Sequence, residues 1–165
     1  MIENLRIGIG HDTHRLVAGG PLRLGGIEVD FDHRLEGHSD ADVLLHAVTD
    51  ALLGAAALGD IGELFPDTDP ANRNRDSGEM LADAARRIRQ IGLEIVNLDC
   101  IVFAQRPKLS SVKREMAGRI GAILGVPPER VGIKAKTGEE TGPVGTGQVM
   151  EAQCVALLSS ATPPG

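Results

Sequence analysis

The chain has 165 residues, of which 42% are hydrophobic and 24% are charged, and its formal net charge is −6. This balance predicts one globular domain and argues against a partner nucleic acid, because phosphate backbones attract basic proteins. No apolar run reaches the roughly 20 residues of a membrane span, and the first residues lack the layout of a signal peptide. We therefore expect no membrane partner.

The two cysteines, Cys100 and Cys154, lie inside apolar runs, and their spacing fits neither a short metal motif nor a disulfide framework. We interpret both as small buried hydrophobic residues. A reducing, cytoplasmic location is the expectation that follows.

The first third of the chain predicts three short strands followed by a helix. Apolar runs separated by glycine turns indicate strands at residues 5–10, 22–24 and 27–29. In the next segment apolar residues recur at helical spacing as far as Ala57. Ser39, with Asp42 three residues later, resembles a capping box. We therefore expect Ser39 to cap this helix and the amides of its first turn to attract anions.

The rest of the chain alternates helices and strands after a loop at residues 59–75. Helices are expected at residues 76–92 and 109–124, and strands at residues 95–103, 131–135 and 149–158. A glycine-rich segment, residues 138–147, separates the last two strands. This order predicts an α+β fold with helices packed on one face of a single mixed sheet. We expect one domain over residues 1–158 and a flexible tail over residues 159–165.

An aspartate and two histidines form the strongest candidate metal site. Asp12 and His14 lie two residues apart in an extended segment, so both point to one face, either to bind a cation or simply as polar residues at a strand end. His46 lies inside the first helix between Asp42 and Asp50, which either orient its ring toward a metal or bind it as a core histidine. Together Asp12, His14 and His46 match the three protein ligands of a catalytic zinc.

Two loops around this site also carry candidate groups. His38 precedes the first helix, where a histidine can contact a phosphate; a pure capping motif is the alternative, and it leaves His38 unexplained. The acidic loop with Asp60, Asp67 and Asp69 is typical both of sites for cations or sugar hydroxyls and of ordinary solvated turns.

Basic and acidic side chains meet again before the glycine-rich segment. Lys134, Lys136 and Thr137 precede Glu139, a combination that can hold a phosphate together with a divalent cation. The spacing fits no nucleotide-binding motif. The residues alone thus predict a divalent-metal site that acts on a phosphorylated small molecule.

Several stretches together resemble one known family, the 2-C-methyl-D-erythritol 2,4-cyclodiphosphate synthases of the non-mevalonate isoprenoid pathway. The similarity covers residues 6 to about 158. Its most specific parts are Asp12-Thr13-His14, the segment from His38 to Asp50, and residues 55–62, 64–70 and 104–109. The resemblance implies conversion of 4-diphosphocytidyl-2-C-methyl-D-erythritol 2-phosphate to 2-C-methyl-D-erythritol 2,4-cyclodiphosphate with release of CMP. It also implies a homotrimer with active sites between neighbouring subunits.

The resemblance further implies a role for individual residues. Asp12, His14 and His46 match the zinc ligands, and Glu139 matches the residue that holds Mg²⁺ or Mn²⁺. The positions assigned to transition-state stabilisation are matched by His38 and Thr137, which we expect to be catalytic. The substrate-binding positions are matched by Ser39, Asp60, Gly62, Phe65, Asp69, Ala104, Lys108, Leu109 and Lys136.

Three residues depart from the family pattern. His11 stands where many members carry an aromatic residue, and strand alternation predicts that it faces away from Asp12 and His14. Lys136 replaces a frequent Thr. Thr146 replaces a frequent Arg near the trimer axis. In the family that arginine helps to line a central cavity that can hold isoprenoid diphosphates, so the resemblance leaves such binding open for this chain.

Two other functions remain open at this point. A zinc hydrolase acting on nucleotides would use water as the nucleophile and would incorporate solvent oxygen into its product. A non-catalytic, metal-dependent sensor of an isoprenoid precursor would need the same metal ligands but would show no turnover.

Overall fold

The computed structural model of the chain describes residues 4–160. Its strands are β1 (Leu5–Ala18), β2 (Leu22–Leu24), β3 (Ile27–Val29), β4 (His33–Glu36), β5 (Leu93–Phe103), β6 (Val131–Lys136) and β7 (Val149–Ser160). Its helices are α1 (Val43–Ala56), α2 (Ile61–Leu64), α3 (Ser77–Gln90), α4 (Lys113–Leu124) and α5 (Gly142–Gly145), with short 3₁₀ helices η2 (Pro70–Asn72) and η3 (Pro128–Arg130). None of the helices in residues 4–160 is long and apolar enough to cross a membrane.

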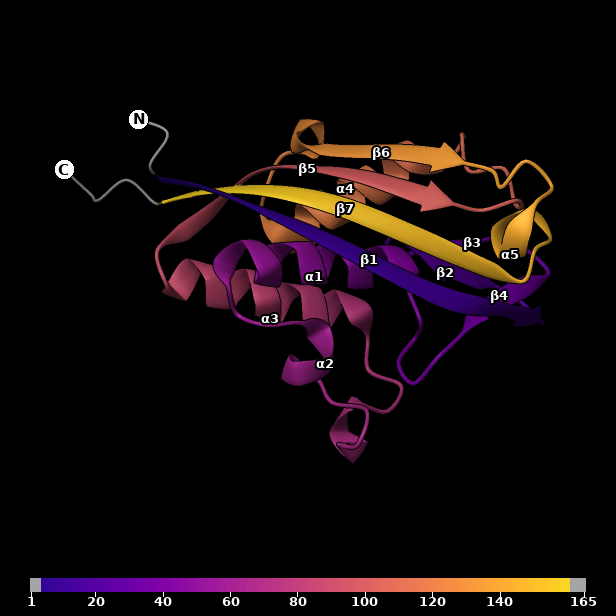
Figure 1. Ribbon diagram of the computed structural model, residues 1–165, viewed down its shortest axis with the longest axis horizontal. Coiled ribbons are helices and arrows are strands. Elements are labelled where there is room, and N and C mark those ends of the chain that lie inside the picture. The colour runs from indigo at the N-terminus through magenta and orange to yellow at the C-terminus, as the bar shows by residue number, and fades with distance from the viewer. Residues whose placement is uncertain (1–3, 161–165) are drawn as a thin grey trace.

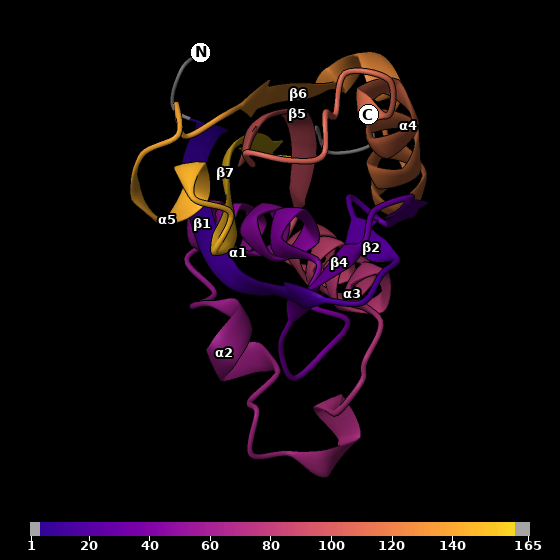
Figure 2. The same ribbon diagram turned by 90° about the vertical axis from the view of Figure 1, so that its right-hand side faces the viewer.

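One mixed sheet and the helices on one of its faces make up the fold (Figures 1 and 2). The strand order is β4-β1-β7-β5-β6, in which β5 and β6 are parallel and the other neighbours antiparallel. Helix α1 packs against β1 and β7, α4 packs against β6, and α3 packs against α1. The hairpin β2–β3 forms a separate small sheet. The predicted α+β class, with helices on one face of a mixed sheet, is confirmed.

Strand β1 has two chemically different faces because successive side chains point to opposite sides of a sheet. Gly8 and Gly10 are buried under α1, and Asp12 and His14 continue the same face. On the other face Ile7 and Ile9 are 73% and 69% exposed. The inner face therefore carries the candidate ligands, whereas the outer face presents large apolar side chains that no element of residues 4–160 covers.

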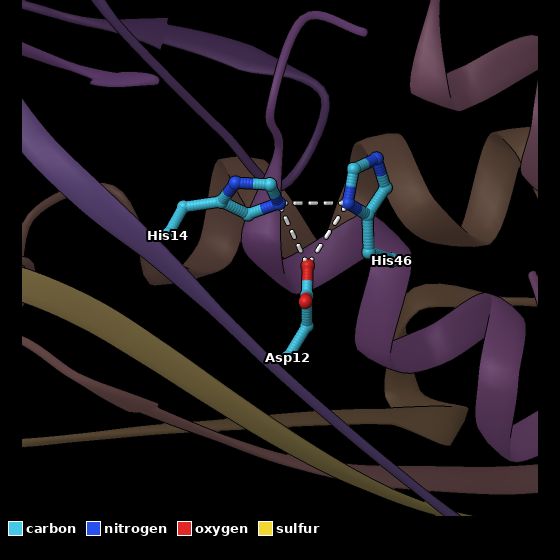
Figure 3. Close-up of side chains that lie close together, drawn as sticks. All are labelled: Asp12, His14 and His46. Atoms are coloured by element: carbon cyan, nitrogen blue, oxygen red, sulfur yellow. Dashed lines mark hydrogen bonds and ion pairs between the residues drawn. The ribbon is translucent and has the colours of Figure 1, made fainter. Parts of the chain in front are cut away.

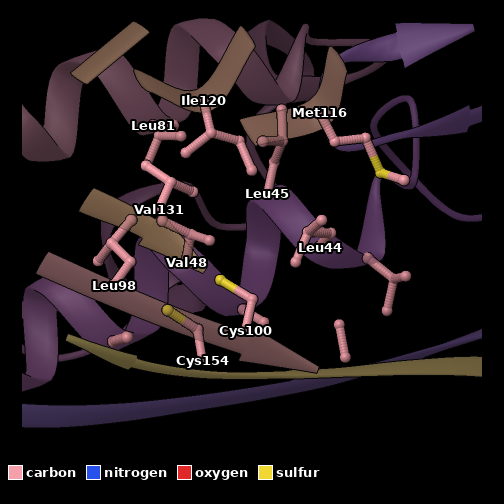
Figure 4. Packing of buried hydrophobic residues seen from close by; sticks show 14 of the residues in the cluster. Leu44, Leu45, Val48, Leu81, Leu98, Cys100, Met116, Ile120, Val131 and Cys154 are labelled. Carbon is pink, nitrogen blue, oxygen red and sulfur yellow. The ribbon is translucent and has the colours of Figure 1, made fainter. Parts of the chain in front are cut away.

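The hydrophobic core fills the space between the sheet and α1, α3 and α4. Leu44, Leu81 and Ile120 are fully buried there, and Cys100 of β5 stands opposite Cys154 of β7 in the same cluster (Figure 4). Both cysteines are free thiols. A hydrogen bond with Cys100, together with burial, raises the pKa of Cys154. The interpretation of both cysteines as buried hydrophobic residues is confirmed.

The start of the first helix differs from the prediction. Helix α1 begins at Val43, and its cap is Asp42, whose carboxylate accepts a hydrogen bond from the backbone N–H of Leu45. The same carboxylate accepts hydrogen bonds from the amides of Gly25 and Gly26 in the β2–β3 turn. The expectation that Ser39 caps the helix is wrong, because these contacts fix Asp42 at the helix start.

Other boundaries shift where neighbouring strands extend the pairing. Strand β1 continues past the expected residue 10 to Ala18, because its second half pairs with both β7 and β4. Helix α4 begins at Lys113 rather than at residue 109, and the expected loop at residues 59–75 contains α2 and η2. Strand β7 runs to Ser160, so residues 159 and 160 pair with β5 instead of forming a tail. Residues 161–165 lie outside the described part.

Candidate active site

Asp12, His14 and His46 meet at one point between β1 and α1 (Figure 3). Oδ2 of Asp12 lies 2.9 Å from Nε2 of His14 and 2.9 Å from Nδ1 of His46, and the two ring nitrogens are 3.1 Å apart. Four tetrahedral ligands about 2.0 Å from zinc stand about 3.3 Å from one another. The triangle therefore has the size that three ligands of one metal ion require.

The second nitrogen of each histidine is already bound to the protein. Nδ1–H of His14 donates to the carbonyl oxygen of Glu36, 2.9 Å away. Nε2 of His46 lies 2.8 Å from Oγ of Ser77, whose hydroxyl donates to the carboxylate of Asp40. Because that hydroxyl is used as a donor, its oxygen accepts the proton on Nε2 of His46. With the outer nitrogen of each ring bound in this way, Nε2 of His14 and Nδ1 of His46 would offer their electron pairs to a metal ion. Without an ion, both nitrogens lie within hydrogen-bond distance of the carboxylate of Asp12.

Three electron-pair donors facing one another need a positive charge between them. Burial raises the pKa of Asp12, but hydrogen bonds and charge attraction from His14 and His46 outweigh it and hold that pKa well below its usual range. Burial lowers the pKa of His14, and the hydrogen bond and charge of Asp12 reverse this and raise it. The carboxylate thus favours a cation at this point. This donor set of one carboxylate and two neutral imidazoles fits zinc.

Asp42 and Asp50, the expected hydrogen-bond partners of the His46 ring, bind backbone amides instead. Asp42 binds the amides already described, and the carboxylate of Asp50 accepts a hydrogen bond from the N–H of Ile61 at 2.7 Å. Within residues 4–160, the ring nitrogens of His46 lie within hydrogen-bond distance of Asp12, His14, Ser39 and Ser77. The alternative of a core histidine bound by Asp42 or Asp50 is therefore wrong, and so is their orienting role.

A cleft of about 200 Å³ opens beside the three ligands. Among its lining residues are His38, Ser39, Gly62 and Phe65, which the sequence analysis singled out. Phe65 is buried, and the guanidinium of Arg75 lies 4.7 Å above its ring. The structure thus places these four residues in the same cleft as the three candidate metal ligands.

The first turn of α1 does not offer the anion site that was expected. Ala41, Asp42 and Val43 are at most 1% exposed, and the carboxylate of Asp42 takes the N–H of Leu45. A negative group already occupies this helix end. An anion in the cleft would therefore meet the side chains of His38 and Ser39 rather than backbone amides.

Two other acidic candidates hold local backbone instead of lining the cleft. Asp60 caps α2 by accepting from the N–H of Glu63, and Asp69 caps η2 by accepting from the N–H of Ala71. Asp67, the third acidic residue of the same loop, lines the cleft itself. His11 faces away from the ligands, as predicted, with its ring 3.5 Å from Glu151.

A second group of predicted residues gathers around another pocket, of about 470 Å³, at the ends of β5 and β6. Its lining includes Ala104, Lys108, Leu109, Lys136 and Thr137. In the sheet, β1 and β6 are separated by β7 and β5 (Figure 1). At about 4.8 Å per strand, β1 with its two ligands and β6 with its end of the second pocket lie on the order of 14 Å apart in one chain.

Glu139 belongs to this second group and not to the cluster of Asp12, His14 and His46. Its backbone has a φ of +52°, a left-handed conformation that costs a non-glycine residue about 1 kcal/mol or more. The hydroxyl of Thr137 lies 3.3 Å from a carboxylate oxygen of Glu139 and 3.3 Å from its backbone nitrogen. These contacts hold the exposed carboxylate close to Thr137.

Comparison with known proteins places the chain in a family. The model of the YgbB family matches residues 5–159. The chain belongs to the YgbB family. The matched range contains all of the ligand and pocket residues described above, so both groups of side chains belong to the same family domain.

Two relatives that match the chain over nearly their whole length share one enzyme name. A protein of Laribacter hongkongensis named 2-C-methyl-D-erythritol 2,4-cyclodiphosphate synthase is 54% identical over 157 residues, which are 95% of this chain and 97% of the relative. A Burkholderia ambifaria protein of the same name is 52% identical and covers 96% and 98%. The resemblance found in the sequence, and with it the expectation of an enzyme of the cyclodiphosphate synthase family, is confirmed.

A solved structure shares the YgbB fold. It is described as IspF of Plasmodium falciparum in a CDP complex, and it superposes with a TM-score of 0.85 at 30% sequence identity. The alignment covers 96% of this chain and 98% of that one.

Sequence reasoning missed two residues that the YgbB chain brings to the metal ligands. Ser77 falls at the start of the helix expected over residues 76–92, and Asp40 falls within the segment from His38 to Asp50. Ser77 is fully buried although its residue type is mostly exposed. Its burial comes from the packing of α3 on α1, and the spacing of residues in the chain carries no sign of it.

Proposed function

We propose that this protein converts 4-diphosphocytidyl-2-C-methyl-D-erythritol 2-phosphate to 2-C-methyl-D-erythritol 2,4-cyclodiphosphate and CMP. An oxygen of the substrate's 2-phosphate forms a bond to the nearer phosphorus of the diphosphate. The bond from that phosphorus to the oxygen of CMP breaks, and CMP leaves with the electron pair. The convergence of Asp12, His14 and His46 beside His38 and Ser39 is the observation that carries this proposal.

The proposed cofactors follow from the donor sets. Asp12, His14 and His46 would hold Zn²⁺ and leave its fourth position for an oxygen of the substrate's diphosphate. Glu139 would hold Mg²⁺ or Mn²⁺, since an exposed carboxylate suits a hard cation. Bound there, the two cations supply positive charge that neutralises the phosphate oxygens.

The chain's own residues bind and align the reacting groups. Intramolecular phosphoryl transfer needs the attacking and leaving oxygens held in line, and the substrate carries its own nucleophile. We assign His38 and Thr137 to stabilising the charge of the transition state and Ser39 and Lys136 to the phosphates. Proposed contacts to the methylerythritol come from Asp60, Gly62, Phe65 and Asp69, and those to the cytidine and its phosphate from Ala104, Lys108 and Leu109.

We further propose a homotrimer in which neighbouring subunits complete each active site. The cleft beside the zinc ligands holds about 200 Å³, below the roughly 300 Å³ at which small-molecule sites begin. In the same chain, the pocket with Lys108 and Lys136 is three strand spacings away from that cleft. A neighbouring copy of the chain can bring its own pocket with Lys108 and Lys136 to this cleft. The apolar outer face with Ile7 and Ile9 supports such an association, because exposed apolar patches mark protein interfaces.

The proposed location is the cytoplasm. Cys100 and Cys154 face each other on adjacent strands as free thiols, which agrees with a reducing compartment.

Phosphorus NMR tests the reaction in one experiment. Zinc- and magnesium-loaded protein is incubated with the proposed substrate in water enriched in ¹⁸O. We expect CMP and a cyclic diphosphate without ¹⁸O. CMP with an uncyclised, ¹⁸O-labelled phosphate would instead indicate a hydrolase, and the absence of CMP from folded, metal-bound protein would contradict catalysis of this reaction.

A further inference from the structure

The ring of His46 is held from behind by a buried serine and an aspartate. We propose that Ser77 and Asp40 are positioning residues that keep Nδ1 of His46 directed at Asp12 and His14 and thereby set the affinity of the site for its metal ion. This inference rests on the zinc site proposed above and adds two residues to it. Neither touches the cleft beside the three ligands.

The contacts define the direction of each hydrogen bond. The carboxylate of Asp40 accepts the hydroxyl proton of Ser77 through one oxygen and the backbone N–H of Ser77, 3.1 Å away, through the other. An ionised carboxylate is only an acceptor, so the hydroxyl has to donate to it. The oxygen of Ser77 then accepts Nε2–H of His46 at 2.8 Å. This hydrogen bond favours the tautomer whose Nδ1 would offer its electron pair to a metal ion.

Ser39 also contacts Nε2 of His46, at 3.1 Å, but it is a weaker candidate for this role. Its oxygen accepts a second hydrogen bond from the N–H of Ala41, and no carboxylate binds its hydroxyl. Ser39 lines the cleft, whereas Ser77 is fully buried. Of the two serine contacts at Nε2, only the one through Ser77 leads on to a carboxylate, that of Asp40.

This arrangement joins three segments that lie apart in the chain. His46 belongs to α1, Ser77 is the first residue of α3, and Asp40 lies in the loop before α1. Asp40 also accepts a hydrogen bond from the N–H of Asp42, the cap of α1, at 3.2 Å. The carboxylate of Asp40 therefore fixes the start of α3 and the start of α1 relative to each other. A hydrogen bond from a metal-bound histidine to such a partner orients its ring and increases its basicity.

Zinc affinity of the full-length chain measures the effect directly. The dissociation constant is obtained by competition with a chromophoric chelator for the wild type and for Ser77→Ala. We expect zinc to bind about 10- to 100-fold more weakly to Ser77→Ala. Thr49→Val is the matched control, because Thr49 is a buried residue of α1 whose hydroxyl donates to the carbonyl of Leu45 and not to the ring of His46. Its dissociation constant should equal that of the wild type.

The tautomer of His46 gives a second readout that does not need the metal. Ring ¹⁵N NMR of the zinc-free protein should show a larger share of the Nε2-protonated form of His46 in the wild type than in Ser77→Ala. In the variant the carboxylate of Asp12, 2.9 Å from Nδ1, competes more strongly for the ring proton. Asp40→Asn, which keeps the size of the side chain, should shift the affinity in the same direction. Ser77→Thr keeps the hydroxyl and should restore the affinity.

The outcomes separate this inference from the proposed metal centre. A wild-type chain that binds no zinc would overturn the metal centre and the inference with it. A wild type that binds zinc, together with Ser77→Ala and Asp40→Asn variants that keep its zinc affinity and its share of the Nε2-protonated form, would overturn only the role of Ser77 and Asp40. An equal loss in Thr49→Val would also overturn it, since the effect would then be a general loss of packing.

Discussion

Gly10 of β1 lies directly against the backbone of Ala47 in α1. A Cβ at Gly10 would stand 1.9 Å from the carbonyl oxygen of Ala47 and 2.7 Å from the amide nitrogen of Ala51. Gly8 has the same relation to the next turn, with its Cβ position 2.0 Å from the carbonyl oxygen of Ala51. The two glycines let α1 approach β1 closely, and this approach brings His46 to the ligands on the same face of the strand.

Replacing Gly10 by alanine should therefore be strongly destabilising. The added methyl group meets helix backbone, which cannot move aside like a side chain, so we expect a loss of about 3 kcal/mol or more in the free energy of unfolding. Gly118→Ala is the control, because a Cβ there meets nothing within 4 Å inside α4, and it should gain about 0.5–1 kcal/mol. Urea unfolding measures both. A Gly10→Ala protein as stable as the wild type would refute the close approach.

Asp42 should contribute more to stability than an ordinary helix cap. Its buried carboxylate accepts from the N–H groups of Gly25, Gly26 and Leu45, so Asp42→Ala leaves buried donors without partners and should cost about 3 kcal/mol. Asp76, the cap of α3, has a side chain that is 48% exposed, and Asp76→Ala should cost about 1 kcal/mol. Equal losses in the two variants, measured by urea unfolding, would contradict the role of burial.

The pH dependence of stability should also reveal Asp42. Burial raises the pKa of this carboxyl in the folded state. The carboxyl of Asp42 therefore keeps its proton in the folded state at a pH where the same carboxyl in the unfolded chain, with a pKa of about 3.9, has released it. The free energy of unfolding of the wild type relative to Asp42→Asn should accordingly fall as the pH rises above about 4. A constant or rising difference in urea titrations across pH 4–7 would contradict this sign.

Zinc should stabilise the protein only when the three ligands are intact. A ligand that binds the folded state at 100 times its dissociation constant adds about 2.7 kcal/mol, so zinc should raise the melting temperature of the wild type. His46→Ala should abolish this rise. His33→Ala is the control, because Nδ1 of His33 lies 2.8 Å from a carboxylate oxygen of Asp32 without a third ligand. A rise that survives in His46→Ala would exclude His46 as a ligand.

The apolar outer face of β1 should control self-association. We expect the wild type to have the mass of a trimer and Ile9→Lys to dissociate, since a buried, unpaired charge opposes the interface. Ile91 is 51% exposed just after α3, compared with 69% for Ile9. Ile91→Lys should therefore leave the mass unchanged. Sedimentation equilibrium measures all three, and a monomeric wild type or a trimeric Ile9→Lys protein would contradict the proposed interface.

The element types and the ligand set were predictable because they depend on local features. Apolar spacing indicated α1 and α3, the glycine pair indicated the β2–β3 turn, and strand alternation put Asp12 and His14 on one face with His11 on the other. Some errors within residues 4–160 fall where a distant partner decides, whereas α2 and η2, which the expected loop contains, are capped locally by Asp60 and Asp69. The cap of α1 is Asp42 because the amides of Gly25 and Gly26 also bind it.

The sequence by itself determined which residue types could bind a metal and a phosphorylated ligand. Only the tertiary structure decided which nitrogen of His46 faces Asp12, and that the zinc ligands and the pocket with Lys108 lie at separate strands of the sheet. The physical reason is that side-chain chemistry and periodicity are properties of neighbouring residues. A ring's orientation depends instead on hydrogen bonds such as that from His46 to Ser77, which form only when α1 and α3 pack together.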